Sequence, residues 1–514
     1  MMYGVARKSS QSITMSEFGI ELALQIGQIL YRGSDALTST RQIPIVNDKP
    51  NQDEPPQAGV APEPATPSAS QAFPRGLNNA FLFSTFNALS FQIILGSPMI
   101  LYAKSLGASA TVLGLIAGMM PLLVIFQIPA ASYIPRMGFR RFVYAGWGTR
   151  VLVIFGMALV PLSVPFLEPQ NRLGLMLGLL FAFNLSRGIS SCAWLPWITA
   201  LVPSNLRGKY LAVDAAVQAV ASCIAFLFAA LLLSKGEPTP GKFALLFAFS
   251  GVTGAISLSF LKRIPDVAIP DEMKALSKAP IPWLAMANHV PFRKLLFMVI
   301  GWSVASGGLT AFTVAFLKTG GMPEANILLA NALAFIGGLG GLALLGLHLD
   351  RVGSKPVLTI SFIGWTAVLF GWVLLAGRLL EVRLSNVMPL LVLLGMLTAF
   401  VQMSNTRLAM AIVPVMGRNH FFAIYSVVGN VVLGLAPICW GLAIDAWGRR
   451  APVHLGVEWN KYALFFALAG VFFLVTLVYA RRLKEPEAMS LEKLLKAILV
   501  DTPVRLWSRL WTRE

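Results

Sequence analysis

Long apolar runs separated by short polar loops organise most of this chain. From residue 79 onward the runs are about 20 residues or longer, and about 20 apolar residues span a bilayer core as a helix. They lie at 79–103, 111–134, 142–164, 173–200, 210–234 and 243–261, and then at 294–317, 325–347, 356–377, 388–413, 421–444 and 461–480. Strands of a membrane barrel would alternate apolar and polar residues, and these runs do not. The pattern predicts an all-α polytopic membrane protein with 12 transmembrane helices.

Polar segments divide the chain into five parts. Residues 1–77 form an amino-terminal tail, with an amphipathic helix expected at 16–31 and a disordered linker at 44–74, which is rich in Pro, Ala, Gln and Ser. The tail helix is either dispensable or a regulatory, partner-binding element. Two six-helix halves follow, residues 78–261 and 294–482, joined by a polar linker at 262–293.

The final part, residues 483–514, has its own pattern. Leucines and tryptophans recur there at helical spacing between arginines. A basic amphipathic helix that carries tryptophan is typical of a segment lying on an anionic membrane surface. Docking to a partner protein is the alternative.

The two halves repeat one another in sequence. Residues 200–203 (ALVP) match residues 411–414 (AIVP) at an offset of 211. Residues 104–107 match 318–321 at an offset of 214, and the turn at 135–140 matches 350–355 at an offset of 215. Parallel repeats are common in transporter folds. Three landmarks in the same order therefore predict a duplicated membrane protein with two six-helix pseudo-repeats.

Composition supports a membrane protein and argues against a nucleic-acid partner. The chain has 514 residues, of which 56% are hydrophobic and 12% charged, whereas soluble domains are about 25% charged. The net charge of +18 comes mostly from short loops rather than from a basic patch interleaved with aromatic residues. The three cysteines fall within apolar runs, so no disulfide framework is predicted. We expect a monomer in the bilayer, with a small solute as partner and no metal or cofactor.

Loop charge predicts the orientation of the chain. If the amino terminus is cytoplasmic, the inner loops carry 14 Lys and Arg residues against 10 in the outer loops. Arg481, Arg482 and Lys484, beside the last run, add to this bias. Because cytoplasmic loops are enriched in Lys and Arg, both termini are expected in the cytoplasm, with the protein in a plasma or inner membrane.

With its duplication, the chain resembles the major facilitator superfamily of transporters over about residues 78–482. That family carries a G-x-L-x-D-R-x-G-R-K turn between spans 2 and 3, with a weaker copy between spans 8 and 9. The second copy is the better one here, and the first has proline at 135 where the acid belongs. The matching residues, interpreted as a gating turn, are Arg136, Gly138 and Arg140 in the first copy and Gly346, Asp350, Arg351, Gly353 and Lys355 in the second.

These turns suggest a latch in the second half. Glycine permits a tight reversal, and Asp350 can accept hydrogen bonds from Arg351 or from a neighbouring helix amino terminus. Such contacts hold two helices together in one conformation and break in another. Pro135 predicts that the first half lacks this latch. The alternative is that the basic residues only mark the cytoplasmic side.

The resemblance implies that spans 1, 4, 7 and 10 surround a central cavity. Residues spaced by three or four positions share one helix face, and polar residues repeat at that spacing in spans 4, 7 and 10, in register through the duplication. The cavity candidates are Gln92 in span 1, Asn184, Arg187, Ser191 and Trp194 in span 4, Ser303, Ser306, Thr310 and Thr313 in span 7, and Thr398, Gln402 and Asn405 in span 10. Hydrogen bonding between helices is the alternative explanation for such residues.

Buried arginines carry the remaining candidate chemistry. Arg187 is near mid-span, and a guanidinium facing a cavity would favour a carboxylate or phosphate. Contact with an anionic solute and a role in helix packing both remain open for it. Arg150 in span 3 is predicted to form a structural ion pair with Asp214 in span 5.

The expected function is transport of a small solute, anionic ones among the candidates, by alternating access as a secondary carrier or facilitator. The chain has no H-E-x-x-H, G-x-S-x-G or P-loop sequence, so an enzyme or an ATP-driven pump is not expected. Asp214 is the one acid well inside a run, which leaves proton coupling open. A non-transporting receptor or scaffold and an exporter of drugs or amphiphiles remain alternatives.

Overall fold

A computed structural model of the chain describes residues 76–203, 206–267, 288–346, 353–412 and 418–483. The tail helix expected at 16–31, the linker at 44–74, most of the segment at 262–293 and the carboxyl-terminal segment lie outside these ranges. Within the described ranges, twelve helical stretches are long and apolar enough to cross a membrane. Their bounds agree with the predicted runs within four residues, so the predicted all-α fold with 12 spans is confirmed.

The first half contains six spans, several of them made of more than one helix. In chain order they are α2 (Asn78–Leu95) with α3 (Ser97–Ser105), α4 (Ala110–Leu122) with η1 (Leu123–Phe126) and α5 (Gln127–Ala131), α7 (Phe139–Leu159) with η2 (Val160–Ser163), α8 (Pro169–Ser190) with η3 (Ser191–Ala193) and α9 (Trp194–Leu201), α10 (Arg207–Ser234), and α11 (Pro240–Leu261). A short helix, α6 (Ile134–Met137), lies in the turn before α7.

The second half repeats this arrangement. Its spans are α14 (Val290–Ser306) with α15 (Leu309–Thr319), α16 (Glu324–Gly346), α18 (Ser354–Ala376), α19 (Leu384–Ile412), α20 (Arg418–Trp447) and α21 (Lys461–Arg481). Between α20 and α21, strands β1 (Val453–His454) and β2 (Val457–Glu458) pair antiparallel. Helices suit the membrane interior because a helix satisfies its backbone hydrogen bonds internally, and lipid offers no hydrogen-bond partners to the backbone.

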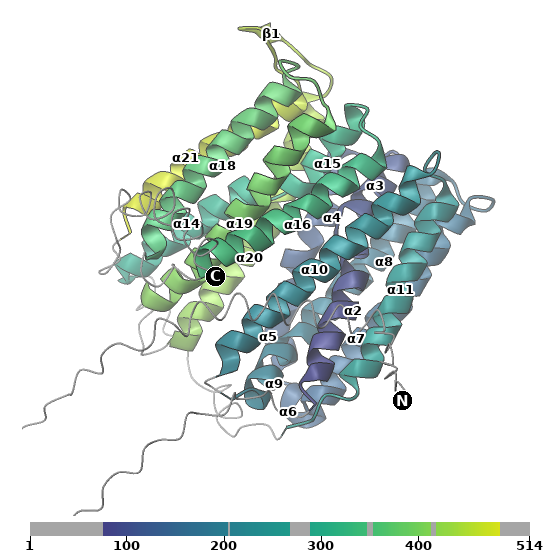
Figure 1. The fold of residues 1–514 in the computed structure, drawn as a ribbon, viewed down its shortest axis with the longest axis vertical. Coiled ribbons are helices and arrows are strands. Elements are labelled where there is room, and N and C mark those ends of the chain that lie inside the picture. The colour runs from purple at the N-terminus through teal and green to yellow at the C-terminus, as the bar shows by residue number, and fades with distance from the viewer. Residues whose placement is uncertain (1–75, 204–205, 268–287, 347–352, 413–417, 484–514) are drawn as a thin grey trace, which may run out of the picture.

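The bundle has two ends, which we name by what they carry. The hairpin face carries β1 and β2, at the top of Figure 1. The tail face is the opposite end, where residues 76 and 483 and the short helix α6 lie. Because the number of spans is even, the chain enters and leaves the bundle on the same face.

The backbone repeats at the spacing predicted from sequence. Gly107 and Gly321, 214 residues apart, have φ angles of 84° and 85°. Gly138 and Gly353, 215 residues apart, have φ angles of 80° and 88° and each precedes a helix that begins at the next residue. A positive φ is strained for residues with a side chain. The same turn is therefore built twice, as the sequence offsets indicate.

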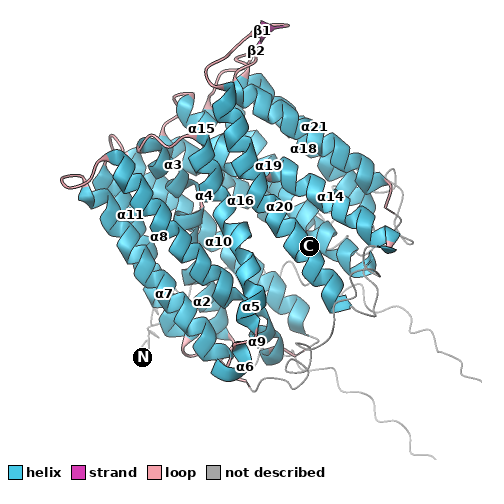
Figure 2. Cartoon of the chain, turned by 180° about the vertical axis from the view of Figure 1, so that it is seen from behind, coloured by secondary structure: helices cyan, strands magenta, loops and turns pink. Residues whose placement is uncertain are grey.

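The two halves meet through α4 with α20, α10 with α16, and α3 with α15. Figure 2 shows α4, α10, α16 and α20 in the middle of the molecule, between the outer helices of each half. One apolar core cluster includes residues of both halves, but in the first half it takes residues from the hairpin-face ends of the spans. The tail-face ends of the first half have a separate cluster, which includes Phe83, Phe139 and Trp197. The halves therefore share a core toward the hairpin face.

Glycines let α4 and α20 approach closely. A Cβ atom built on Gly114 would lie 2.1 Å from the carbonyl oxygen of Pro437, and one on Gly118 would lie 2.2 Å from that of Gly434. A Cβ on Gly441 would lie 2.5 Å from the carbonyl oxygen of Ala110. Backbone atoms cannot move aside as a flexible side chain can. This contact thus requires glycine at these positions, and it closes the hairpin side of the bundle.

Candidate functional site

A cavity of about 630 Å³ lies between the two halves. Its walls come from α2, α3 and α10 of the first half and from α14, α15, α16, α18, α19 and α20 of the second. A volume of this size is in the range of small-molecule sites, which are commonly concave and mostly apolar with a few polar groups. Two breaks in the transmembrane helices border the cavity, at Gly96 between α2 and α3 and at Gly307–Gly308 between α14 and α15.

Several of the predicted cavity residues line it. Gln92, Ser306, Thr310 and Gln402 do so, together with Thr313 and Thr398 from the same predicted polar faces. They come from spans 1, 7 and 10. None of the described lining residues comes from span 4, which the family resemblance had included.

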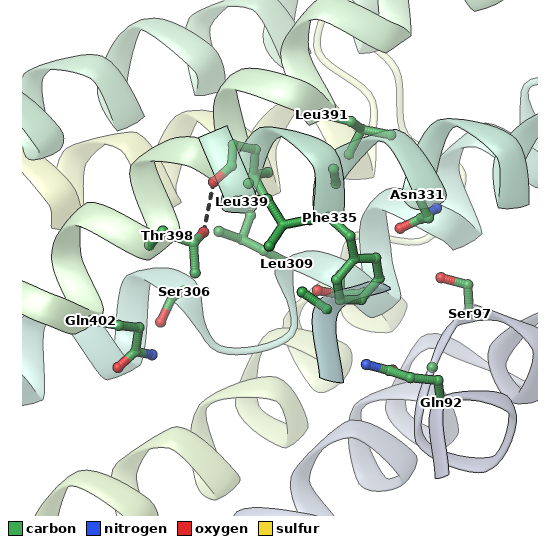
Figure 3. Close-up of a pocket in the computed structure, with 18 of the residues that line it drawn as sticks. Gln92, Ser97, Ser306, Leu309, Asn331, Phe335, Leu339, Leu391, Thr398 and Gln402 are labelled. Atoms are coloured by element: carbon green, nitrogen blue, oxygen red, sulfur yellow. Dashed lines mark hydrogen bonds between the residues drawn. The ribbon is translucent and has the colours of Figure 1, made fainter. Parts of the chain in front are cut away.

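Polar side chains gather in two groups, separated by apolar ones. Ser306, Thr398 and Gln402 lie at one end of the cavity, and Gln92, Ser97 and Asn331 at the other (Figure 3). Leu309, Phe335 and Leu339 lie between them (Figure 3).

At the first end the hydroxyls are already bonded within their own helices. Ser306 Oγ donates to the carbonyl oxygen of Trp302 at 2.7 Å, and Thr398 Oγ1 donates to that of Leu394 at 2.7 Å. They retain only their capacity to accept hydrogen bonds.

Aromatic side chains form part of the wall. Trp302 and Trp365 meet edge to face with ring centroids 5.6 Å apart, and Phe226 of the first half stacks on Phe335 of the second at 5.6 Å. Among the described lining residues there is no Asp, Glu, Lys, Arg or His. The cavity thus presents apolar and aromatic surface with uncharged hydrogen-bonding groups.

The predicted polar face of span 4 packs inside the first half instead. Asn184 is 1% exposed and donates from Nδ2 to the carbonyl oxygen of Leu180 at 3.0 Å. Ser191 accepts a hydrogen bond of 2.6 Å from Gln127 Nε2, and Trp194 packs against Phe83. The contacts of Ser191 and Trp194 match the alternative explanation, hydrogen bonding and packing between helices, whereas Asn184 bonds within its own helix.

A change of helix type also interrupts the stripe after Ser190, although Asn184 and Arg187 lie before it in α8. The prediction assumed one continuous α-helix, in which residues spaced by three and four share a face. The segment instead has a 3-10 turn, η3, between α8 and α9. A 3-10 turn has three residues per turn instead of 3.6, so Trp194 is rotated away from the face that Asn184 occupies.

Arg187 is half-buried near the end of α8 and does not line the cavity. It lies close enough to Arg150 for the two positive charges to repel. The structure therefore gives no geometry by which Arg187 binds a solute in the cavity, and packing within the first half is the role that fits its position.

We expect Arg187→Gln to leave the apparent KM of solute uptake within about twofold of the native value, because the side chain does not border the cavity. Gln402→Leu, which alters a lining residue, is the comparison and should raise KM. The measurement is the concentration dependence of uptake into vesicles at matched protein content. A large rise in KM for Arg187→Gln alone would restore the anion-binding interpretation.

Two further candidates lie outside the cavity wall. Ser303 is 3% exposed and its Oγ donates to the carbonyl oxygen of Gly429 at 3.2 Å, which joins α14 to α20. Asn405 is 6% exposed, and neither residue is among the described lining residues. Both lie on the helices that the sequence selected, but they do not face the cavity.

The predicted ion pair between Arg150 and Asp214 is not formed in the structure. The Arg150 guanidinium stacks on Trp147, with its central carbon 3.7 Å from the ring centroid, and its Nε and Nη2 atoms have no hydrogen-bond partner among described residues. Asp214 accepts a hydrogen bond of 2.7 Å from Gln218 Nε2. Each side chain thus contacts a residue of its own helix, Trp147 in α7 and Gln218 in α10, and the two are not paired.

The gating turns are partly described. Arg136 lies in α6, Gly138 makes the positive-φ turn before α7, and Arg140 Nε lies 3.6 Å from Asp266 Oδ2 in a half-exposed ion pair. In the second copy Gly346 ends α16 and Gly353 precedes α18, with Lys355 in its first turn. Asp350 and Arg351 lie outside the described ranges, so the latch at Asp350 stays a prediction.

A different aspartate joins the two halves, on the hairpin face. Asp445, near the end of α20, accepts from the backbone N–H groups of Ala110 at 3.0 Å and Thr111 at 2.8 Å, and from Thr111 Oγ1 at 2.7 Å. A carboxylate is stabilised at a helix amino terminus by the unpaired N–H groups and by the helix dipole. We call this contact the Asp445 cap. It holds α20 of the second half to α4 of the first.

The sequence carried signals for the residues that our prediction missed. Ser97 precedes proline, a common start of a helix, and follows Gly96 in the middle of a long run, which indicates a break. Asn331 stands alone in the apolar run ILLANALAF. Asp445 is an acid close to a span end, a position typical of an ordinary loop boundary.

The fold and the cavity together define a polytopic membrane transporter built of two six-helix halves. The sequence profile of the Major Facilitator Superfamily matches residues 80–380 and 329–514. The chain belongs to this superfamily, and it is a secondary transporter of small solutes rather than an enzyme. A comparison with curated protein sequences finds no match.

Solved structures share the fold at low sequence identity. The inward open conformation of the xylose transporter XylE from E. coli matches with a TM-score of 0.60 and 13% identity, covering 81% of this chain and 98% of that one. The nucleoside transporter NupG matches with a TM-score of 0.55 and 12% identity, covering 79% and 97%. A POT family transporter in complex with 5-aminolevulinic acid has a TM-score of 0.58 and 13% identity, covering 80% and 97%.

Proposed function

We propose that this chain moves its solute by alternating access, with the cavity between the halves as the binding site. The observation that carries the proposal is the one-sided closure of the cavity. Helices α4 and α20 pack through glycines, and the Asp445 cap bridges the halves, all on the hairpin side. A bundle joined in this way can open by rocking of one half against the other.

Closure on the hairpin side supports access from the tail face in this conformation. The shared core reaches the hairpin-face ends of the first half, whereas the tail-face ends have their own separate core cluster. The tail-face part of span 2 is exposed at Ile125, Phe126 and Ile128. Solute would enter the cavity from the tail face here and leave from the hairpin face after the halves rock.

The excess of Lys and Arg in the loops of the tail face supports a cytoplasmic location for both chain ends. Arg136 in α6, Arg140 at the start of α7 and Arg263 just after the end of α11 lie on that face. Cytoplasmic loops carry such an excess. On this basis the cavity faces the cytoplasm in a plasma or inner membrane, and a reagent that cannot cross the membrane should reach the hairpin loops from outside.

The cavity supports an uncoupled facilitator or exchanger over a proton symporter. Proton coupling through the solute site needs a titratable group there, and the described lining has none. Asp214 is half-buried elsewhere in the first half, where it accepts a hydrogen bond from Gln218. Solute would then move down its own gradient or in exchange for a second solute.

A vesicle experiment tests the proposal. Purified protein is first screened for solutes that raise its thermal unfolding temperature, and those solutes are then followed radiolabelled into protein-containing and empty vesicles. We expect saturable uptake that excess unlabelled solute inhibits and that an imposed pH gradient does not drive. Flux that does not saturate would indicate a channel instead. Binding without flux would indicate a receptor built on a transporter fold.

A further inference from the structure

We propose that the end of the cavity formed by Gln92, Ser97 and Asn331 binds an uncharged hydroxyl or amide group of an amphipathic solute. The apolar body of the solute would lie against Leu309, Phe335 and Leu339. This inference rests on the proposed function, because it assigns the part of the solute that the same cavity recognises. We call the three polar residues the hydroxyl subsite.

Ser97 supplies the strongest evidence for the subsite. It is the first residue of α3, it is 0% exposed, and it lines the cavity. Its Oγ has no hydrogen-bond partner among the described residues. Buried polar groups are normally satisfied by protein, water or ligand. The Ser97 hydroxyl therefore needs a partner that comes from inside the cavity.

Asn331 and Gln92 face the same end with spare capacity (Figure 3). Asn331 Nδ2 donates to the carbonyl oxygen of Ile327 at 2.8 Å, and Gln92 Nε2 donates to Ser222 Oγ at 2.9 Å. Each amide has two N–H donors and an oxygen acceptor, so each keeps its oxygen and one N–H. Thr313 also lines the cavity and is 3% exposed. Like the hydroxyl of Ser97, its hydroxyl has no hydrogen-bond partner among the described residues.

The chemistry of these groups selects an uncharged ligand that both donates and accepts. Serine and amide side chains can each donate and accept, which matches a hydroxyl or amide on the solute. A carboxylate or ammonium group would lose its hydration in this cavity without meeting an opposite charge, because no charged side chain is among the described lining residues. The structure thus disfavours both ions at this position.

The position of the subsite also links binding to the conformation. Ser97 belongs to the first half and Asn331 to the second. A solute hydroxyl bonded to both joins the halves on the same side as the Asp445 cap. Binding energy at this end would therefore favour the conformation that is closed toward the hairpin face.

A matched probe series tests the assignment on the full-length protein in lipid nanodiscs, with empty nanodiscs as the blank. The probes are naphthylbutanol, naphthylbutanamide, naphthylbutanoate, naphthylbutylammonium and the methyl ether of naphthylbutanol. We expect the alcohol and the amide to bind about tenfold more tightly than the ether and the two ions, the size of effect that one neutral hydrogen bond provides. Equal affinity across the series, or no saturable binding of the alcohol, would overturn the subsite.

Variants connect the preference to named residues. Ser97→Ala and Asn331→Leu should each reduce the preference for the alcohol over the ether, while affinity for the ether stays near the native value. Ser259→Ala is the control, since that hydroxyl lies in α11, outside the cavity wall, and donates to the carbonyl oxygen of Ile256 at 2.7 Å. Retention of the full preference in both subsite variants would exclude the assignment.

Failure of the inference and of the proposed function are separable. If saturable flux is measured but the probe preference is absent, the protein is a carrier whose solute is recognised elsewhere in the cavity. If the preference is present and the variants remove it, but no probe or screened solute crosses vesicles, the subsite stands and the transport proposal fails.

Discussion

Gly118→Val is expected to reduce uptake by at least tenfold, because valine cannot fit where α4 and α20 touch. A Cβ at this position would lie 2.2 Å from the carbonyl oxygen of Gly434. Overpacking costs about 1–3 kcal/mol or more, which is about a fivefold to 150-fold change in the population of the closed state, and a clash with backbone at this distance favours the upper part of that range. Uptake into vesicles at matched protein content measures the effect.

Gly178→Val is the matched control for that variant. Gly178 also lies within a transmembrane helix, α8, and a Cβ atom added to it would meet no other atom within 4 Å. Both variants replace helical glycine by the same β-branched residue, so any effect on helix propensity is shared. Normal uptake by Gly118→Val, or an equal loss in the two variants, would contradict a closing contact at Gly118.

Asp445→Asn is expected to shift the protein toward the conformation that opens at the hairpin face. The carboxylate accepts hydrogen bonds from two backbone N–H groups and a hydroxyl at the start of α4, and an asparagine amide nitrogen cannot accept them. Hydrogen bonds to charged groups contribute about 1.5–3 kcal/mol. Because this cap is partly exposed, we expect the lower end of that range, a change of about tenfold in the ratio of the two conformations.

Cysteine labelling measures that shift. Thr310→Cys places a thiol on the cavity wall, in a background where Cys192, Cys223 and Cys439 are replaced by serine. A membrane-impermeant maleimide applied from the hairpin side should label Thr310→Cys about tenfold faster when Asp445→Asn is present. Glu381→Gln is the control, since Glu381 pairs with Arg383 of the same loop and joins no halves. An unchanged labelling rate would show that the cap does not hold the bundle closed.

The junction of α4 with α20 has an equivalent in the repeat, the junction of α16 with α10. Among the described residues, the equivalent junction has no counterpart of the Asp445 cap. Subtracting the repeat offset of 211 from 445 gives 234, and Ser234 occupies that position at the end of α10. Its Oγ donates to the carbonyl oxygen of Leu231 in its own helix at 2.8 Å. The α10–α16 junction instead uses apolar contacts such as the stacking of Phe226 on Phe335. If Asp445 is replaced, no charged cap at Ser234 compensates for the lost contact between the halves.

Sequence alone determined the parts of this protein that depend on local chemistry. The number and length of the spans follow from apolar run length, since lipid requires each crossing segment to satisfy its own backbone. The repeat offsets predicted the paired turns at Gly138 and Gly353, because a positive φ at a tight turn favours glycine in both copies. Helical spacing also selected Ser306 and Gln402, and the repeat register selected Gln92; all three line the cavity.

Only the tertiary structure decided which polar residues face the cavity and which pack between helices. Asn184 and Ser191 have the same polar character as Gln402, but Asn184 is buried and bonded to Leu180 of its own helix, and Ser191 is bonded to Gln127 of span 2. Helical periodicity shows that one face of a helix is polar. It does not show whether that face contacts a neighbouring helix or an aqueous cavity.

Contacts between residues far apart in the chain were likewise decided by the fold. Asp445 and Thr111 are separated by 334 residues, and nothing in the local pattern around either one indicates the other. Arg150 and Asp214 had the charges and depths for an ion pair, but the fold leaves them apart, and each contacts a residue of its own helix instead, Trp147 and Gln218. Charge and depth can be read from sequence, whereas the choice among partners depends on distances that only the packed helices set.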